Sequence, residues 1–351
     1  MGGAGPAAPP ESPDAGPRPT PPVDTGRGLA SVEVSGYQLL VRWQGPGGTV
    51  SEPTPFDIRG ISWSPAQKGA GLPGPGDYLQ AAGRDLPLMQ QANINVVKTY
   101  VPVDRALLDR LLDHGMVAIV TVLPRAGDPV APVVEKLRDH PALLMWLVGN
   151  EWNYNNLYGS CAPDACYDLV NQTARQIKAL DPKHPVATSF APKGELPSES
   201  DLRRLDAIDV WGLNVYSQPG FFNRFVNWRV LGLRSGIKKP FFMSEYGTDA
   251  FDQKTGRPNE AGQAEALRRQ TAEIRAQLSS RNPGLPCLGG TPFEWNDEWW
   301  KHGNPGAQDS GGFANPGVAV DEFANEEWWG IVDVERRPRM AYQVLKELYA
   351  Q

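Results

Sequence analysis

Apolar runs of strand length alternate with amphipathic stretches of helix length along most of the chain. A short, continuous apolar run indicates a strand that is buried on both faces, as in parallel sheets covered by crossover helices. The strand candidates, by residue number, are 56–63, 94–100, 116–123, 143–150, 186–190, 207–216, 241–246 and 288–295. Eight such strands predict an α/β fold that closes as a single (β/α)₈ barrel. An open, doubly wound sheet shares this alternation, but no glycine-rich phosphate loop opens a helix, which favours the barrel.

The remaining segments complete the predicted domain. Helices are expected at 86–92, 104–114, 164–180, 260–279 and 340–349. Residues 30–43 alternate apolar and polar side chains around Ser35-Gly36, which predicts a short N-terminal β-hairpin. Residues 1–28 are rich in Pro, Gly and Ala and lack the apolar core of a signal peptide, so we expect a disordered linker or a vector-derived start there. One folded domain is therefore expected over residues 29–351.

Charge and composition exclude several partners. The net charge is −6 and the pI is about 5.4, so neither nucleic acid nor an anionic membrane surface is an expected partner. No apolar stretch is long enough to span a bilayer, so stable membrane insertion is not expected. Cys and His show no metal-ligand spacing, so we expect no metal and no cofactor. We also expect the protein to be a monomer. The cluster Arg336, Arg337 and Arg339 is expected to be solvated.

The three cysteines bear on the cellular compartment. Cys161 and Cys166 are close enough in sequence to form a bridge within one loop or to remain a free pair, whereas Cys287 falls in an apolar strand. A bridge indicates an oxidising compartment. We therefore expect a periplasmic or secreted protein, whose export signal or anchor is not part of this chain.

Two of the predicted strands end in a glutamate. Glu151 follows the fourth strand directly, and Glu245 lies near the end of the seventh. A carboxylate after an apolar run lies at the mouth of the barrel, where an unpaired buried charge is costly. The fourth and seventh strands face each other across a closed barrel, and barrel active sites are built at this end. We therefore predict that Glu151 and Glu245 form a catalytic pair.

Two facing carboxylates match one class of reaction. Retaining glycosidases hold two such groups about 5–5.5 Å apart, one to attack the anomeric carbon and one to protonate the leaving oxygen. The charge of one carboxylate raises the pKa of the other, as a general acid at neutral pH requires. The chain also contains eleven tryptophans, several beside Asn, Asp or Glu, and such pairs suit the apolar face and hydroxyl edge of a sugar.

Five segments resemble the barrels of clan A glycoside hydrolases, and most closely the barrel of the family 2 β-glycosidases. Residues 149–153 (Gly-Asn-Glu-Trp-Asn) look like the fourth-strand motif, and 243–247 (Met-Ser-Glu-Tyr-Gly) like the seventh-strand nucleophile motif. The segments 58–63 and 213–216 fit strands one and six of that family. Residues 97–100 are similar to its second strand, and to that of fungal glucanosyltransferases and bacterial family 17 glucan enzymes.

The resemblance implies roles for individual residues. Glu151 corresponds to the acid/base, Glu245 to the nucleophile, and Asn150 to the residue that binds the sugar 2-hydroxyl. From its position at the end of the sixth predicted strand, Tyr216 is expected to donate a hydrogen bond to Glu245. Trp295, at the end of the eighth predicted strand, is expected to stack on the sugar at the cleaved position.

Further substrate-binding candidates follow from their places near strand ends. Arg59 is expected either to hold Glu245 by a charged hydrogen bond or to form a structural ion pair beneath the site. Four other residues are expected to line sugar subsites or bind sugar hydroxyls: Tyr100, Trp63, Trp152 and Glu298.

The sequence leaves more than one activity open. The β-sandwich domains that precede the barrel in family 2 are not among these 351 residues. We expect hydrolysis of a β-glucan or a β-linked oligosaccharide through a covalent glycosyl-enzyme. A β-glucanosyltransferase uses the same two glutamates with a sugar as acceptor. A non-catalytic carbohydrate-binding barrel is disfavoured because both glutamates are present.

Overall fold

The computed structural model describes residues 28–124, 129–192, 196–216 and 221–351, so nearly all of the predicted N-terminal linker lies outside the described residues. Eight parallel strands close into a barrel in the order β10-β13-β4-β5-β6-β7-β8-β9. They are β4 (Ile58–Ser62), β5 (Val96–Lys98), β6 (Val117–Val122), β7 (Leu143–Asn150), β8 (Val186–Phe190), β9 (Val210–Asn214), β10 (Phe241–Glu245) and β13 (Cys287–Gly290). The predicted closed barrel is confirmed, because β13 pairs with both β4 and β10.

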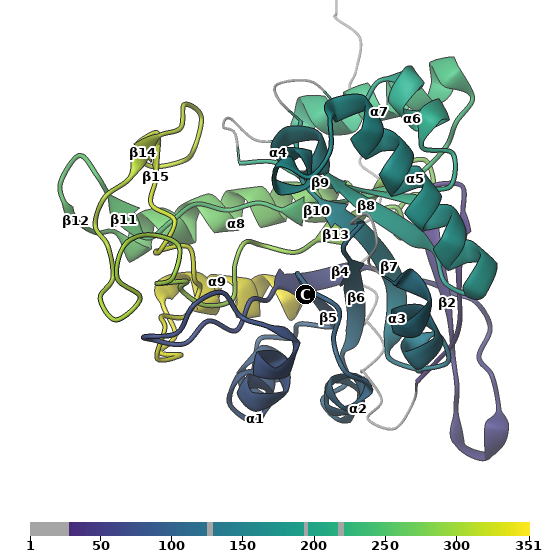
Figure 1. Ribbon diagram of the computed structural model, residues 1–351, viewed down its shortest axis with the longest axis horizontal. Coiled ribbons are helices and arrows are strands. Elements are labelled where there is room, and N and C mark those ends of the chain that lie inside the picture. The colour runs from purple at the N-terminus through teal and green to yellow at the C-terminus, as the bar shows by residue number, and fades with distance from the viewer. Residues whose placement is uncertain (1–27, 125–128, 193–195, 217–220) are drawn as a thin grey trace, which may run out of the picture.

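Helices surround the barrel, as Figure 1 shows. They are α1 (Pro75–Gln91), α2 (Arg105–Asp113), α3 (Val130–Leu137), α4 (Trp152–Gly159), α5 (Pro163–Leu180), α6 (Glu199–Arg204), α7 (Phe222–Ser235), α8 (Glu260–Ala276) and α9 (Met340–Tyr349). The first predicted helix began too late. We expected Pro87 in its first turn, but Pro75 has that place and Pro87 lies inside the helix.

A three-stranded antiparallel sheet covers the N-terminal end of the barrel. It consists of β1 (Leu29–Ser35), β2 (Gln38–Trp43) and β3 (Thr54–Pro55), and β1 and β2 form the predicted hairpin. Val32, Leu39 and Val41 on this sheet join the apolar cluster formed by the first residues of the barrel strands. Because this end is closed, the C-terminal end is left for a site.

A long excursion, residues 291–339, connects β13 to α9 and forms much of the lobe at the left of Figure 1. It contains the short pair β14 (Phe313–Ala314) and β15 (Phe323–Ala324). A second short pair, β11 (Phe251–Asp252) and β12 (Arg257–Pro258), follows β10 in the same lobe.

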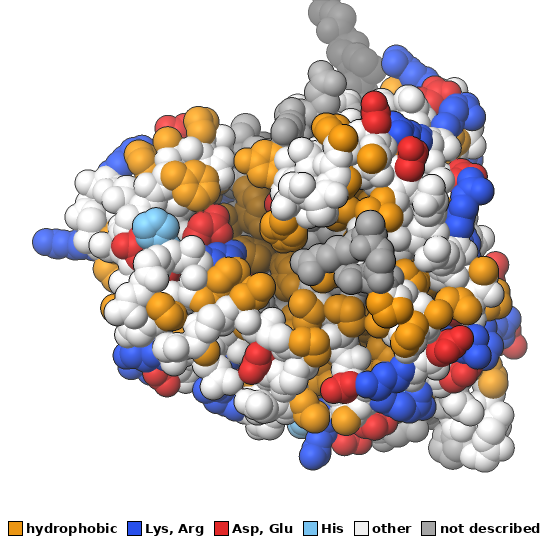
Figure 2. Space-filling view, in the orientation of Figure 1, with side chains coloured by type: hydrophobic (Ala, Val, Ile, Leu, Met, Phe, Trp, Pro, Cys, Tyr) orange, Lys and Arg blue, Asp and Glu red, His pale blue; other side chains and the backbone are white. Residues whose placement is uncertain are grey.

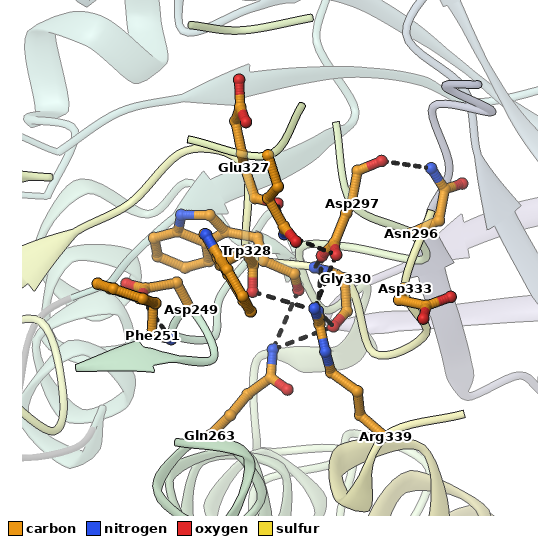
Figure 3. Close-up of polar contacts among 12 residues, drawn as sticks. Asp249, Phe251, Gln263, Asn296, Asp297, Glu327, Trp328, Gly330, Asp333 and Arg339 are labelled. Atoms are coloured by element: carbon orange, nitrogen blue, oxygen red, sulfur yellow. Dashed lines mark hydrogen bonds and ion pairs between the residues drawn. The ribbon is translucent and has the colours of Figure 1, made fainter. Parts of the chain in front are cut away.

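A buried ion pair anchors this excursion, as Figure 3 shows. Arg339 donates two hydrogen bonds to the Asp297 carboxylate, at 2.6 and 2.7 Å, and a third to the Gly330 carbonyl. Gln263 on α8 donates to the carbonyls of Trp329 and Gly330. The expectation of a solvated arginine cluster was therefore wrong for Arg339, which is buried against a carboxylate partner. It was also wrong for Arg336, which is buried and paired with Asp85.

Cys161 and Cys166 form a disulfide, and Cys287 is free and buried in β13. The bridge ties the end of α4 to the start of α5. The sequence had left open whether these two cysteines form a bridge or remain free. None of the described helices combines the length and the apolar character needed to cross a bilayer.

Candidate active site

A cavity of about 400 Å³ opens at the C-terminal ends of the barrel strands, and both predicted catalytic glutamates line it. Figure 2 shows a hollow near the middle of this face, with apolar side chains gathered around it. The lining residues contributed by the excursion are Phe293, Glu298, Trp300, Lys301, Asn315, Glu326 and Trp329. The barrel thus supplies the two carboxylates, while the excursion supplies much of the wall.

Glu245 is the last residue of β10 and is buried, with 4% of its surface exposed. Lys98 Nζ lies 2.7 Å from its Oε1, and the Tyr100 hydroxyl donates to the same oxygen at 2.8 Å. The Tyr216 hydroxyl donates to Oε2 at 2.6 Å. Burial alone raises the pKa of Glu245, but the Lys98 charge and these hydrogen bonds outweigh it and hold that pKa below its usual value. Glu245 is therefore ionised at neutral pH.

Glu151 follows β7 in a left-handed backbone conformation (φ 52°, ψ 25°), which directs the chain into α4. This conformation costs about 1–3 kcal/mol in a residue with a side chain and occurs mainly at functional sites. Gly149 also has a positive φ, and a Cβ there would meet Trp152 at 3.1 Å. The Trp152 indole N–H in turn donates to Thr188 Oγ1 at 2.7 Å. In the Gly-Asn-Glu-Trp-Asn motif, the glycine and the tryptophan therefore fix the turn that presents Glu151.

Glu151 has the opposite electrostatic environment from Glu245. Burial, followed by the negative charge of Glu245, raises the pKa of Glu151 to about 7. Asn214 is a side-chain partner of Glu151, and its Nδ2 donates to Oε1 at 3.0 Å. Ser244 Oγ donates to Asn214 Oδ1 at 2.6 Å, which orients the amide and links it to the residue before Glu245.

The two glutamates therefore have different protonation states in one cavity. A carboxyl group with a pKa of about 7 is able to give and take a proton near neutral pH. A carboxylate held ionised by an ammonium and two phenols is suited to attack an electrophilic carbon. A pair of acids whose surroundings separate their pKa values is the pattern that assigns one as general acid and the other as nucleophile.

The structure brings four further predicted residues to this cavity: Asn150, Tyr100, Tyr216 and Glu298. The expected hydrogen bond from Tyr216 to Glu245 is present. Tyr100 also bonds to Glu245, a contact that we did not anticipate when we expected it to form a subsite wall.

Arg59 does not hold Glu245. It is the second residue of β4, at the N-terminal end of the barrel and opposite the mouth, and its Nη1 donates to the Tyr349 carbonyl at 3.4 Å. Lys98, at the end of β5, takes the predicted role instead. A lysine at the end of a buried apolar strand is the signal that we overlooked, because lysine is almost never fully buried without a partner.

The three tryptophans that we expected to contact the sugar lie elsewhere. Trp63, Trp152 and Trp295 have no exposed surface and are not among the residues that line the cavity. Trp63 donates its indole N–H to Asp85, and Trp295 packs near Tyr342 of α9. These large rings fill the space between the barrel and its outer layer.

The error at Trp295 has a local cause. We extended the eighth strand to residue 295, but β13 ends at Gly290 and the chain turns into the excursion. The aromatic ring of this segment that lines the cavity is Phe293, which packs edge-on against Tyr100 and Tyr216. Among the described side chains, no cluster of three or more His, Cys, Asp and Glu is arranged to hold a metal ion.

Comparison with known proteins finds glycoside hydrolases among the relatives of this chain. Residues 121–263 match the family described as "Glycosyl hydrolases family 2, TIM barrel domain". Mannan endo-1,4-β-mannosidase F of Aspergillus clavatus is 37% identical over 141 residues, which is 34% of this chain and 30% of that protein. A β-glucuronidase of Paenibacillus borealis is 22% identical over 200 residues, 48% of this chain and 31% of that protein.

Two solved structures share the fold across nearly the whole chain. A GH2 β-galacturonidase from Eisenbergiella tayi, bound to galacturonate, superposes with a TM-score of 0.62 and 20% identity over 91% of this chain and 54% of that chain. A Bifidobacterium dentium β-glucuronidase superposes with a TM-score of 0.60 and 19% identity, over 91% of this chain and 49% of that chain. The chain spans less than two thirds of each of these proteins. The predicted resemblance to the TIM barrel domain of the family 2 glycosyl hydrolases is therefore confirmed, with the family match itself lying over residues 121–263.

Proposed function

We propose that this protein is a retaining β-glycoside hydrolase that cleaves by double displacement. One observation carries the proposal: Glu245 and Glu151 line the same cavity, and their surroundings shift their pKa values in opposite directions. The relatives described as a mannosidase and a glucuronidase support the same reaction class.

The first step uses both carboxyl groups. Glu245 attacks the anomeric carbon, the bond from that carbon to the leaving oxygen breaks, and protonated Glu151 gives its proton to that oxygen. A covalent glycosyl-enzyme results. In the second step Glu151, now ionised, takes a proton from water, whose oxygen attacks the anomeric carbon and releases Glu245. Lys98, Tyr100 and Tyr216 position Glu245 and stabilise its charge whenever it is free.

The substrate that we propose is a β-linked oligosaccharide or polysaccharide. The support is the aromatic lining of the cavity, to which Tyr100, Phe293, Trp300 and Trp329 contribute. Flat aromatic rings offer faces for successive sugar units. A β-glucan is the class favoured by the sequence, and a β-mannan is the alternative favoured by the Aspergillus relative.

Transglycosylation is a second candidate, because it differs only in the acceptor of the second step. The aromatic wall of the excursion gives a sugar acceptor a surface on which to dock. A catalytically silent sugar-binding barrel is disfavoured, because it has no use for two carboxyl groups with opposed pKa shifts.

The test is product analysis by proton NMR with aryl β-glycosides and oligosaccharides of the gluco and manno series. A β-configured first product supports retention, whereas an α-configured one excludes it. Longer products on addition of an oligosaccharide acceptor support the transferase.

We also propose a periplasmic or secreted location for the protein. The Cys161–Cys166 disulfide supports it, since such bonds persist in oxidising compartments.

A further inference from the structure

We infer that this pocket selects uncharged sugars and rejects uronides, and that an ion-paired cluster of Lys301, Glu298 and Glu326 sets this selectivity. The inference rests on the proposed function and adds to it the charge class of the substrate. The fold leaves that class open, because sugar specificity belongs to the lining of a site and not to the barrel.

The cluster is a fixed part of the pocket wall. Lys301 Nζ lies 2.9 Å from Glu298 Oε2 and 3.0 Å from Glu326 Oε2. The side chains of Lys301 and Glu298 are 18% and 3% exposed. Trp300 donates its indole N–H to Glu298 Oε1 at 3.1 Å, and the ammonium stands 4.5 Å from the centre of the Phe293 ring. These contacts leave the lysine little freedom to turn toward a new partner.

The cluster adjoins the place where the sugar is cleaved. The Phe293 ring under the ammonium packs against Tyr100 and Tyr216, the two residues that donate hydrogen bonds to Glu245. Burial and Glu245 raise the pKa of Glu151, and Lys301 opposes them, so the ammonium is within electrostatic reach of the proposed acid. A sugar held between the two glutamates therefore has the cluster as a neighbour.

The charges of the wall are unfavourable for an anion. Among the described residues that line the cavity, Lys301 is the one cation, and the acids are Glu151, Glu245, Glu298 and Glu326. Lys98 neutralises Glu245, which leaves one ammonium facing two carboxylates in the cluster. The described wall is thus negative in net charge even when Glu151 is protonated.

A uronide meets this wall with a carboxylate. To pair with Lys301, that carboxylate must displace Glu298, which is 3% exposed and would be left buried without its counter-charge, or approach beside Glu326, which is 40% exposed and repels it as a like charge. If it does not pair, it lies among like charges, which also costs binding energy. The hydroxymethyl group of a neutral hexose has neither cost, and it is able to donate a hydrogen bond to either glutamate. Rejection by like charge is a recognised route to specificity.

The experiment compares sugars that differ only at this group. The two pairs of 4-nitrophenyl glycosides are β-glucoside with β-glucuronide and β-galactoside with β-galacturonide. We expect kcat/KM of the neutral glycoside to exceed that of the matching uronide by about 100-fold or more in at least one pair. Glu326→Gln removes one of the two partners of Lys301, and the uronide-to-neutral ratio is expected to rise about tenfold. Glu52→Gln, in the connection between β2 and β3 where that side chain is 95% exposed, removes the same charge at the other end of the barrel and leaves the ratio unchanged.

Calorimetry separates selectivity from turnover. The iminosugar isofagomine is expected to bind more tightly than its analogue with a carboxylate in place of the hydroxymethyl group. Tighter binding of the carboxylate analogue, a wild-type preference for uronides, or an unchanged ratio in Glu326→Gln overturns the inference and leaves the glycosidase assignment standing. Preferential binding of the neutral iminosugar without turnover of any glycoside overturns the proposed hydrolase but supports the selectivity. Binding of neither overturns both.

Discussion

Replacing Lys98 by methionine tests what keeps Glu245 ionised. The two charged groups are 2.7 Å apart, and both side chains are buried. Removing one partner of a buried ion pair costs about 3–5 kcal/mol, because the other charge is left uncompensated. Glu245 is able to avoid much of this cost by taking up a proton. At about 1.4 kcal/mol per pKa unit, 3 kcal/mol corresponds to a pKa of Glu245 about two units higher in the variant.

The kinetic consequence is a shift of the acidic limb of the pH profile. In the wild type the pKa of Glu245 lies below its usual value, so kcat/KM falls only at low pH. In Lys98→Met the acidic limb is expected to move up by about two units, which is about 100-fold in kcat/KM at a pH below both limbs. A 2,4-dinitrophenyl β-glycoside suits the assay, because its leaving group needs no proton and the limb then reports Glu245 alone.

The same shift predicts how stability varies with pH. In the wild type the folded pKa of Glu245 is lower than the unfolded one, so its ionisation stabilises the fold above the unfolded pKa, and this contribution is lost as the pH falls through the folded pKa. In Lys98→Met the folded pKa is the higher of the two, so stability is lost as the pH rises through it. The deficit in the free energy of unfolding is therefore expected to be larger at pH 7 than at pH 4.

The double variant Lys98→Met/Glu245→Gln is the control for charge. It removes both charges and keeps a side chain of similar shape, so denaturant unfolding is expected to show most of the lost stability restored at pH 7. An acidic limb at the wild-type position, or an equal deficit at both pH values, would refute the view that Lys98 controls the ionisation of Glu245.

Three further outcomes are expected. Glu245→Ala abolishes turnover of every substrate, because no group remains to form the covalent intermediate. Glu151→Ala keeps the first step for dinitrophenyl glycosides and yields a β-configured glycosyl azide when azide is added. An α-configured azide from this variant would show that Glu151 is the nucleophile and Glu245 the acid/base. In the wild type, kcat/KM for poor leaving groups falls as the pH rises through about 7, because Glu151 must be protonated to act, and a basic limb far from there contradicts its assignment. Trp300→Ala raises KM for oligosaccharides by about fivefold, the equivalent of about 1 kcal/mol. Trp63→Ala lowers Tm by opening a cavity and leaves KM unchanged, because this side chain is buried. An equal rise in KM for both variants would contradict the conclusion that Trp63 lies outside the sugar site.

The barrel was predictable because its signals are local. Each strand is an apolar run, and β7, β8 and α9 have the predicted bounds to the residue. The catalytic pair was predictable for a related reason. A charged residue at the end of an apolar run is costly to bury, and only the geometry of a closed barrel brings two such ends together. The hydrogen bond from Tyr216 followed from its place at the end of the sixth predicted strand.

The errors have other causes, among them the direction in which a side chain points and the end of the barrel at which it lies. Trp63 follows β4 by one residue, and Arg59 lies four residues before it on the same run, yet neither side chain reaches the cavity. Tryptophan content alone does not separate a ring that binds sugar from one that fills the layer between barrel and helices. The partners of Arg339 and Arg336 were also out of reach, because Asp297 and Asp85 are 42 and 251 residues away in sequence.

The division between barrel and excursion has a consequence for how the site is built. Glu151, Glu245 and the side chains that tune them lie at the ends of β5, β7, β9 and β10 or directly after them, where backbone hydrogen bonds of the barrel fix their positions. The Lys301 cluster, Trp300 and Trp329 lie on the excursion, in which the Asp297–Arg339 pair joins two distant parts and to which Gln263 of α8 is hydrogen-bonded. We therefore expect substitutions at the cluster to change which sugar is accepted and to leave the two glutamates in place. Loss of Arg339 is expected to destabilise the excursion, because it leaves Asp297 buried without its counter-charge. The proposed selectivity and the proposed catalysis are in this way assigned to different segments of the chain, and only the residues proposed for catalysis belong to the barrel itself.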